Sequence, residues 1–218
     1  LIDKSFLRRT PEGHFEIHPA LRQYAAEKLV HNPDRQIETR SQHAHYYSKW
    51  LTQINEKLKG GEQFVALAML RTETPNLHDA WQWLIEQGDL ERLRHILPAM
   101  ILFHEMHGRP VEAQEVVKLL RAMLHLLRRV LGDEVKVAKT SAIPLPGLSY
   151  NGLLALTLAA LRHFSLAQEP LEQTNRYQEE SLRIAQELHD DQEKAFTLLL
   201  NSREKGILTP QQSLALIQ

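Results

Sequence analysis

Ala155-Leu156-Thr157-Leu158 is the stretch that decides the fold, because its pattern returns as Ala195-Phe196-Thr197-Leu198. Pro170 returns in the same way as Pro210, so both offsets are 40 residues. A repeat of this length, made of two helices, is typical of an α-solenoid, in which helical hairpins stack on their neighbours. The sequence therefore predicts an all-α fold in which residues 91–218 form such hairpins.

The composition of the whole chain agrees with a helical protein. The 218 residues are rich in Leu, Ala, Gln and Glu and poor in β-branched residues, which favours helix throughout. The 26 Lys and Arg against 27 Asp and Glu give a net charge of −1, which argues against nucleic acid as the main partner. The chain has no Cys, which excludes a disulfide framework and fits a reducing, cytoplasmic compartment.

No membrane or secretory segment is expected. The most apolar run, residues 152–161, is shorter than the ~20 residues that a bilayer-spanning helix needs. No signal-peptide pattern is present either. Because the chain opens without Met and in the middle of an element, we expect a piece of a longer protein.

A small β-hairpin is expected near the N-terminus. Residues 5–9 and 14–18 flank Thr10-Pro11-Glu12-Gly13, in which Pro at the second position and Gly at the fourth suit a type I turn. Phe15 and Ile17 alternate with polar residues, as in a half-buried strand. Two strands alone are marginal in water, so this hairpin must lean on the following helices or on a preceding segment.

Helical spacing predicts most of the remaining elements. Pro19 fits the first position of an amphipathic helix that ends near Leu29 and whose inward residues are Leu21, Tyr24 and Ala25. The further helices are expected over 34–58, 62–71, 74–88, 93–106, 111–131, 148–164, 170–188 and 191–205, with a last one from 210.

Caps and breaks separate these helices. Asp34 and Thr74 are the expected N-caps of two of them, Pro75 would follow Thr74 at a first helical position, and Asp190 or Asp191 would cap another. The inward stripes comprise Ile37, Ala44, Tyr47, Leu51, Ile54 and Leu58 in one helix and Leu77, Ala80, Trp81 and Leu84 in another. Residues 132–147, with Pro144 and Pro146, are expected to form a long loop.

Three stretches of the chain resemble the STAND-class signalling ATPases. These are the bacterial relatives of the apoptosome and plant-resistance NB-ARC ATPases, and many are transcriptional regulators. Leu1–Arg9 followed by Phe15–Leu29 resembles the end of their winged-helix domain, Glu73–Asp89 their linker helix, and Tyr177–Asp190 their tetratricopeptide-like repeats. The likeness covers nearly the whole chain except residues 132–147.

The resemblance implies three parts and a role for one residue. Residues 1–31 would be a winged-helix remnant, 34–90 a connecting helical segment, and 91–218 a tetratricopeptide-like superhelix. In the family a Met-His-Asp-like motif places a His on the β-phosphate of bound ADP and holds the protein off. His18 matches that His, Ile17 stands for the Met, and Pro19 replaces the Asp.

The residues themselves leave two interpretations of His18 open. It lies at a strand–helix junction, where unpaired N–H groups and the helix dipole favour an anion, but it also suits a plain capping or edge-strand residue. A charge-assisted hydrogen bond contributes ~1.5–3 kcal/mol. Shifting a two-state equilibrium from almost entirely one state to almost entirely the other takes ~5.5 kcal/mol. Contacts between domains would therefore have to supply the remainder of the switch.

No catalytic site is expected in this chain. It contains no Gly-rich phosphate loop with Lys, no Ser-His-Asp order and no paired carboxylates, so this chain should neither bind ATP tightly nor hydrolyse it. The resemblance implies that ADP or ATP binds, and ATP is hydrolysed, in an upstream domain of the parent protein.

Two His pairs, His43/His45 and His104/His107, invite a metal interpretation. Residues i and i+2 of a helix point apart, and no acidic or Cys ligand completes the second pair, so no metal is expected.

Two further groups have competing interpretations. Arg121, Arg128 and Arg129 form a small basic run, which fits a solvated helix face better than a nucleic-acid site. The three Trp residues fit core better than a recognition platform, with Trp81 on an apolar stripe and Trp83 less constrained than Trp50 or Trp81.

The expected function is that of a non-catalytic sensor arm. The superhelix would bind a protein or small-molecule inducer and relieve the ADP-held inhibition, with the upstream nucleotide-binding domain as second partner and no membrane or direct nucleic-acid contact. The alternative is a stand-alone tetratricopeptide-type scaffold without a nucleotide switch. Direct DNA binding through the wing is disfavoured, because Arg8 and Arg9 are too few for strong phosphate contact.

Overall fold

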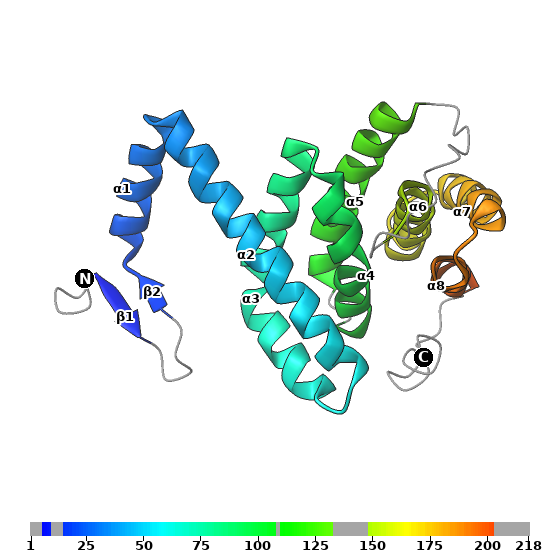
Figure 1. The fold of residues 1–218 in the computed structure, drawn as a ribbon, viewed down its shortest axis with the longest axis horizontal. Helices are drawn as coiled ribbons and strands as arrows, with labels where there is room; N and C mark the ends of the chain where they lie inside the picture. Colours follow the sequence, from blue (N-terminus) through cyan, green and yellow to red (C-terminus); the bar gives the residue numbers. More distant parts are fainter. Residues whose placement is uncertain (1–5, 10–14, 108–109, 133–147, 203–218) are drawn as a thin grey trace. The chain divides into compact units, whose positions relative to one another are not determined.

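The computed structural model describes residues 6–9, 15–107, 110–132 and 148–202 (Figure 1). Within these residues the chain is helical apart from one β-hairpin, which confirms the predicted all-α class. The chain divides into two compact units, Leu1–His43 and Ala44–Gln218. The predicted turn at 10–13, nearly all of the predicted loop at 132–147 and the predicted helix from 210 lie outside the described residues.

The first unit contains the predicted hairpin. Strands β1 (Leu7–Arg9) and β2 (Phe15–Ile17) are antiparallel, with Leu7 opposite Ile17 and Arg9 opposite Phe15. Helix α1 (Pro19–Val30) follows at once, with Pro19 at its first position as predicted. Pro fits there because its missing N–H has no partner in the first turn of a helix.

Helix α1 differs from the predicted amphipathic helix, because none of its residues is buried. Tyr24, predicted to face inward, is 56% exposed, and Val30 is 65% exposed. Leu21 and Leu29 are only half-buried, while Ala25 is exposed. The spacing of apolar residues was sufficient for a helix, but no described part of the first unit buries them.

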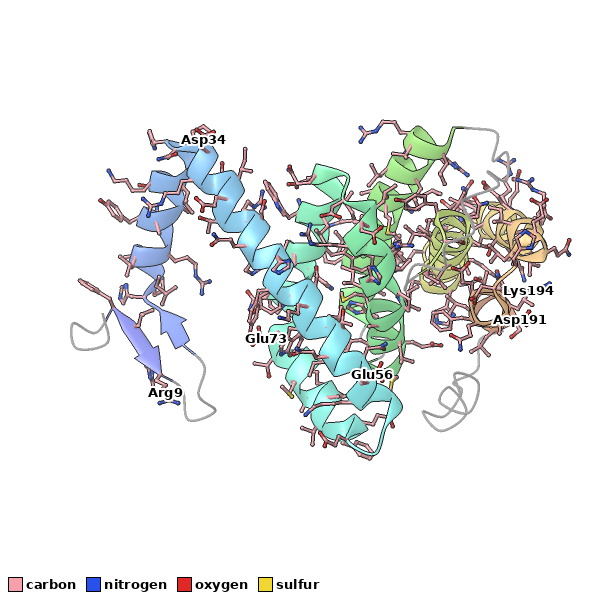
Figure 2. All side chains as sticks on the ribbon, in the orientation of Figure 1. Arg9, Asp34, Glu56, Glu73, Asp191 and Lys194 are labelled. Carbon is pink, nitrogen blue, oxygen red and sulfur yellow. The ribbon has the colours of Figure 1, made fainter. Side chains whose placement is uncertain are left out.

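Helix α2 (Pro33–Lys59) begins one residue before the predicted cap Asp34, which is labelled in Figure 2. The cap is Asn32, whose Oδ1 accepts a hydrogen bond from the Arg35 backbone N–H at 3.2 Å. Pro33 then occupies the first helical position, which accounts for the shift. Ile37, predicted to be inward, is 50% exposed.

In the second unit the inner face of α2 follows the prediction. Ala44, Leu51, Ile54 and Leu58 are all buried. These residues recur at helical spacing, and together they cover one side of the hydrophobic core.

Helix α3 (Gln63–Gln87) is continuous, so the prediction of two helices over 62–71 and 74–88 is wrong. Pro75 lies inside the helix, and Thr74 is no cap, because its hydroxyl donates to the Leu70 carbonyl at 3.0 Å. Leu70 and Leu77, on either side of the Pro, are both buried. Burial of one continuous face offsets the backbone hydrogen bond that Pro cannot make.

Helix α3 ends where predicted. Gly88 has a φ of 67°, and its N–H caps the helix by donating to the Ile85 carbonyl at 3.1 Å. A left-handed residue at this position favours Gly, which lacks a Cβ.

The next two helices, α4 (Leu90–His107) and α5 (Pro110–Leu131), run beside α3 in Figure 1 and contact it. Their inner faces supply much of the core, including the fully buried Phe103, Leu120 and Met123. The predicted helices over 93–106 and 111–131 are thus confirmed with slightly extended ends.

Helix α6 (Tyr150–Ser165) is the centre of the second unit. It contacts α4 and α5 as well as α7 (Leu171–Glu187) and α8 (Asp191–Ser202), and these neighbours surround it in Figure 1. Every residue from Gly152 to Arg162 is buried. The apolar run of the sequence is therefore the core of a helical assembly. Across the part of the chain that the structure describes, no helix is long and apolar enough to cross a membrane.

The start of α8 confirms one of the two predicted caps. Asp190 Oδ1 accepts hydrogen bonds from the backbone N–H groups of Gln192 at 2.8 Å and Glu193 at 2.9 Å. Asp191 is instead the first residue of the helix.

Candidate functional site

His18 lies at the junction between β2 and α1, as the sequence predicts. Its backbone N–H donates to the Phe6 carbonyl at 3.2 Å, which ties the start of α1 to the residue before β1. Its ring Nδ1 accepts a hydrogen bond from the Ala20 backbone N–H at 3.3 Å, so His18 is the N-cap of α1. The residue is exposed.

This geometry divides the two ring nitrogens of His18 by role. The cap uses the lone pair of Nδ1, so a neutral ring carries its proton on Nε2. Any contact with a phosphate would therefore have to come from Nε2. His18 therefore caps α1 through Nδ1, as one of its two interpretations predicts. The cap does not use Nε2, whose N–H has the chemistry to donate to a phosphate oxygen.

The structure pairs His104 with a residue that sequence spacing did not suggest. Its Nε2 lies 3.1 Å from Nε2 of His78 on α3, and the two ring centroids are 5.0 Å apart. His104 is 6% exposed and His78 is half-buried. The side chain of His107, the partner considered from the sequence, lies outside what the structure describes.

Other predicted metal candidates are not brought together. His45 is exposed while His43 is half-buried, in line with their i, i+2 spacing. Among the described residues no three His, Asp or Glu side chains form a group that could hold a metal ion.

The basic run on α5 forms ion pairs. Arg121 pairs with Glu169 in the α6–α7 connection, and Arg128 Nη2 lies 2.7 Å from Glu180 Oε2 on α7. The hydrogen bond to Glu169 also raises the pKa of Arg121. The side chains of Arg121 and Arg128 thus tie α5 to the following hairpin.

The Trp residues behave mostly as core. Trp81 is fully buried and Trp83 is 7% exposed. Trp50 is half-buried beside Tyr47, with ring centroids 6.1 Å apart.

A half-buried polar contact that the sequence did not reveal joins α2 to α3. The Tyr47 hydroxyl donates to Glu73 Oε2 at 2.7 Å, and Asn76 Nδ2 donates to the same oxygen at 2.7 Å. Burial and then the bond to Glu73 raise the pKa of Tyr47. Glu73, labelled in Figure 2, is thus the shared acceptor of this contact.

A second polar contact joins α6, α7 and α8. The Ser181 hydroxyl donates to the Ala155 carbonyl at 2.8 Å and accepts from Asn201 Nδ2 at 2.9 Å. Asn201 also donates to the Thr197 carbonyl at 3.0 Å. Both polar side chains, Ser181 and Asn201, are buried, so this contact fixes the register of one helix against the next.

The third polar contact lies at the start of α6. Both carboxylate oxygens of Glu193 accept from Ser149, Oε1 from its backbone N–H and Oε2 from its hydroxyl at 2.6 Å. Ser149 Oγ in turn accepts from the Gly152 N–H at 2.9 Å and caps α6. A Cβ on Gly152 would clash with the Glu193 carboxylate, which would then have to move out of its present position. We call these three residues the Glu193 clasp.

A fourth contact joins the end of α4 to the end of α6. His163 Nε2 lies 3.6 Å from Glu105 Oε1, which suggests an ion pair at first sight. Burial, followed by the nearby Arg162 charge, lowers the pKa of His163 to about 4. Desolvation therefore wins, and the ring is neutral at pH 7.

The comparisons with known proteins give no relative. No protein-family model matches the chain, and no curated protein or solved structure is significantly similar to it.

Proposed function

We propose that the chain is the non-catalytic sensor arm of a STAND-type ATPase signalling or transcription regulator. In this proposal the first unit is the end of a winged helix that meets an upstream nucleotide-binding domain holding ADP. The helical hairpins bind a protein or small-molecule inducer. Inducer binding then loosens the contact of His18 with the β-phosphate and relieves the inhibition.

The observation that carries the proposal is the uncovered state of α1. A helix that buries no residue gains little from its apolar side chains, and short isolated helices are marginal in water. Tyr24 and Val30 on this helix are more than half exposed. A neighbouring domain that covers them would supply the missing burial along α1, the helix whose N-terminal end carries His18.

The helical hairpins support the second half of the proposal. Thr157 on α6 and Thr197 on α8, 40 residues apart, are both buried. Leu158 is fully buried, whereas its counterpart Leu198 is 38% exposed. This difference is expected if α6 is an internal helix of a stack and α8 opens the next tetratricopeptide-like hairpin. Extended stacks of this kind offer large concave binding surfaces.

The test is ADP retention in the full-length parent protein. His18→Ala removes both the cap and the imidazole, whereas His18→Ser keeps a good capping oxygen and removes only the imidazole. A phosphate contact predicts that both variants lose bound ADP and raise basal signalling. If His18→Ser retains ADP like the wild type, His18 acts as a cap only and the sensor role is wrong.

The alternative of a scaffold without a nucleotide switch has its own outcome. Absence of a Gly-rich phosphate loop within roughly 300 residues upstream in the full-length protein would favour the scaffold. Either a small inducer or a protein partner stabilises the folded state on binding, so both can be detected by a thermal-shift screen. A shift with cell metabolites indicates a small inducer, and a shift with the protein fraction of an extract alone indicates a protein partner.

A further inference from the structure

Helix α8 carries a mostly apolar stripe that the described part of the chain leaves uncovered. We call it the α8 stripe, and it consists of Ala195, Leu198, Leu199 and Ser202. The spacing i, i+3, i+4 and i+7 places these residues on one side of the helix. Leu198 is 38% exposed, Leu199 is half-buried, and the other two residues are exposed. The opposite side of α8 is buried.

The 40-residue repeat relates the α8 stripe to a buried stripe on α6. The counterparts, 40 residues earlier, are all buried and comprise Ala155, Leu158, Ala159 and Arg162. Helix α7 follows α6 and contacts it, and α8 contacts both (Figure 1). Pro170 directly precedes α7, and the repeat places Pro210 at the same point after α8. The chain after Pro210 therefore corresponds to the helix that covers α6.

A hydrogen bond gives the register of α7 on α6. The Ser181 hydroxyl donates to the Ala155 carbonyl at 2.8 Å, so these two residues lie at the same level of the helix pair. The short connection over 166–170 makes the pair an antiparallel hairpin. A step of four residues forward along α6 is then matched by four residues back along α7, which places Tyr177 opposite Ala159. Both residues are buried, as this register requires.

The same register can be carried forward by 40 residues. Residues 203–218 lie outside the described part of the chain, so their correspondence is one of sequence. Ile217 corresponds to Tyr177, and Leu214 corresponds to Thr174. Tyr177 and Thr174 are both buried on α7. Apolar side chains thus occupy the two positions at which the corresponding residues of α7 are buried.

We propose that residues 211–218 form a helix that covers the α8 stripe, with Ile217 packed against Leu199. This proposal rests on the helical-repeat part of the proposed function and needs neither His18 nor a nucleotide. The contact would remove the apolar side chains of the stripe from water. It would also make α8 an internal helix of the array, as α6 is, and would leave the new helix as the surface on which a further repeat can stack.

The test is disulfide cross-linking, because the chain has no Cys of its own. Leu199→Cys combined with Ile217→Cys should form a disulfide on mild oxidation, since facing residues of packed helices lie within the reach of a disulfide. Leu199→Cys combined with Ala215→Cys is the matched control, because residues 215 and 217 lie on opposite sides of a helix. We expect at least about tenfold more disulfide from the first pair than from the control.

Equal yields from the two pairs, or no disulfide from either, would overturn the proposal. A second measurement uses no Cys. Ile217→Asp should lower Tm by about 2–4 °C, because it places a charge against the α8 stripe, whereas Ala215→Asp should leave Tm unchanged. Equal Tm values for these two variants would also contradict the contact. None of these outcomes alters ADP retention by the His18 variants, so failure of this register and failure of the nucleotide switch are distinguishable.

Discussion

Helices α1 and α6 have similar lengths, but one is exposed to solvent and the other is buried. Helix α1 spans 12 residues and buries none of them, whereas α6 spans 16 residues and 12 of them are buried. Both helices carry several apolar side chains, although α6 contains the most apolar run of the chain. The difference is the number of neighbours, because α6 is contacted by α4, α5, α7 and α8. Burial in α6 is thus supplied by its packed neighbours, and among the described residues α1 gains no such burial.

The sharpest test of this comparison truncates one side chain in each helix. Leu158→Ala should lower the free energy of unfolding by about 3 kcal/mol, because it leaves a cavity in a packed interior. Tyr24→Ala should change it by less than about 0.5 kcal/mol, because the ring is mostly in solvent. Urea unfolding of both variants measures the difference. Equal losses would show that α1 is covered in the isolated chain.

A pH titration sharpens the comparison at the C-terminal end of α6. The folded-state pKa of His163 is about 4, below the unfolded value of 6.5, so between these two values the unfolded chain binds more protons. Stability therefore falls as the pH drops from 6.5 to 4, by up to about 3 kcal/mol, and this contribution is constant above 6.5. His163→Phe, which cannot be protonated, should show a flatter pH dependence of Tm. Parallel curves for the two proteins would refute the neutral buried ring.

The Glu193 clasp tests the N-terminal end of α6. Glu193→Ala should cost about 2 kcal/mol, because it leaves the Ser149 N–H and hydroxyl without their acceptor. Glu179→Ala, at an exposed position of α7, is the control and should be nearly neutral.

The clasp also predicts coupling between two positions. Gly152→Ala should destabilise the wild type, because its Cβ displaces the Glu193 carboxylate, but should be neutral or stabilising in Glu193→Ala. Gly61→Ala, where an added Cβ meets nothing within 4 Å, serves as the steric control. Additive effects of the two substitutions would rule out the clasp.

The smallest effect is expected in α3, which is buried on one face only. In a continuous helix, Pro75→Ala restores a backbone hydrogen bond and should stabilise the protein by about 1 kcal/mol. If a new helix began at Pro75 instead, Ala would lose the advantage of Pro at a first position and bring no gain. Thermal unfolding of this variant distinguishes the two.

The sequence was a good guide wherever a pattern repeats locally. The spacing of Leu51, Ile54 and Leu58 placed the inner face of α2, and alternation placed the β-hairpin. It failed at Thr74-Pro75, where a local start signal was overridden by burial on both sides of it. It also failed for α1, because spacing describes which residues can face inward and not whether anything covers them.

The polar contacts of the candidate sites were beyond prediction for a different reason. His78 and His104, or Ser149 and Glu193, lie 26 and 44 residues apart on separate elements. Such pairs depend on how helices cross, and no residue spacing in one helix encodes that. His18 was placed at its junction because its contacts are with near neighbours in the chain.

The burial of α6 has a consequence for the order of synthesis. The last residue of its buried run is Arg162, but α8, which completes its cover, ends at Ser202. At a translation rate of 5–20 residues per second, these residues emerge about 2–8 s apart. During that interval the side of α6 that α8 covers in the folded chain is still exposed. The length of this interval is set by the 40 residues between Arg162 and Ser202, which is also the length of the sequence repeat. A chaperone that covers exposed apolar side chains would act on α6 within this interval.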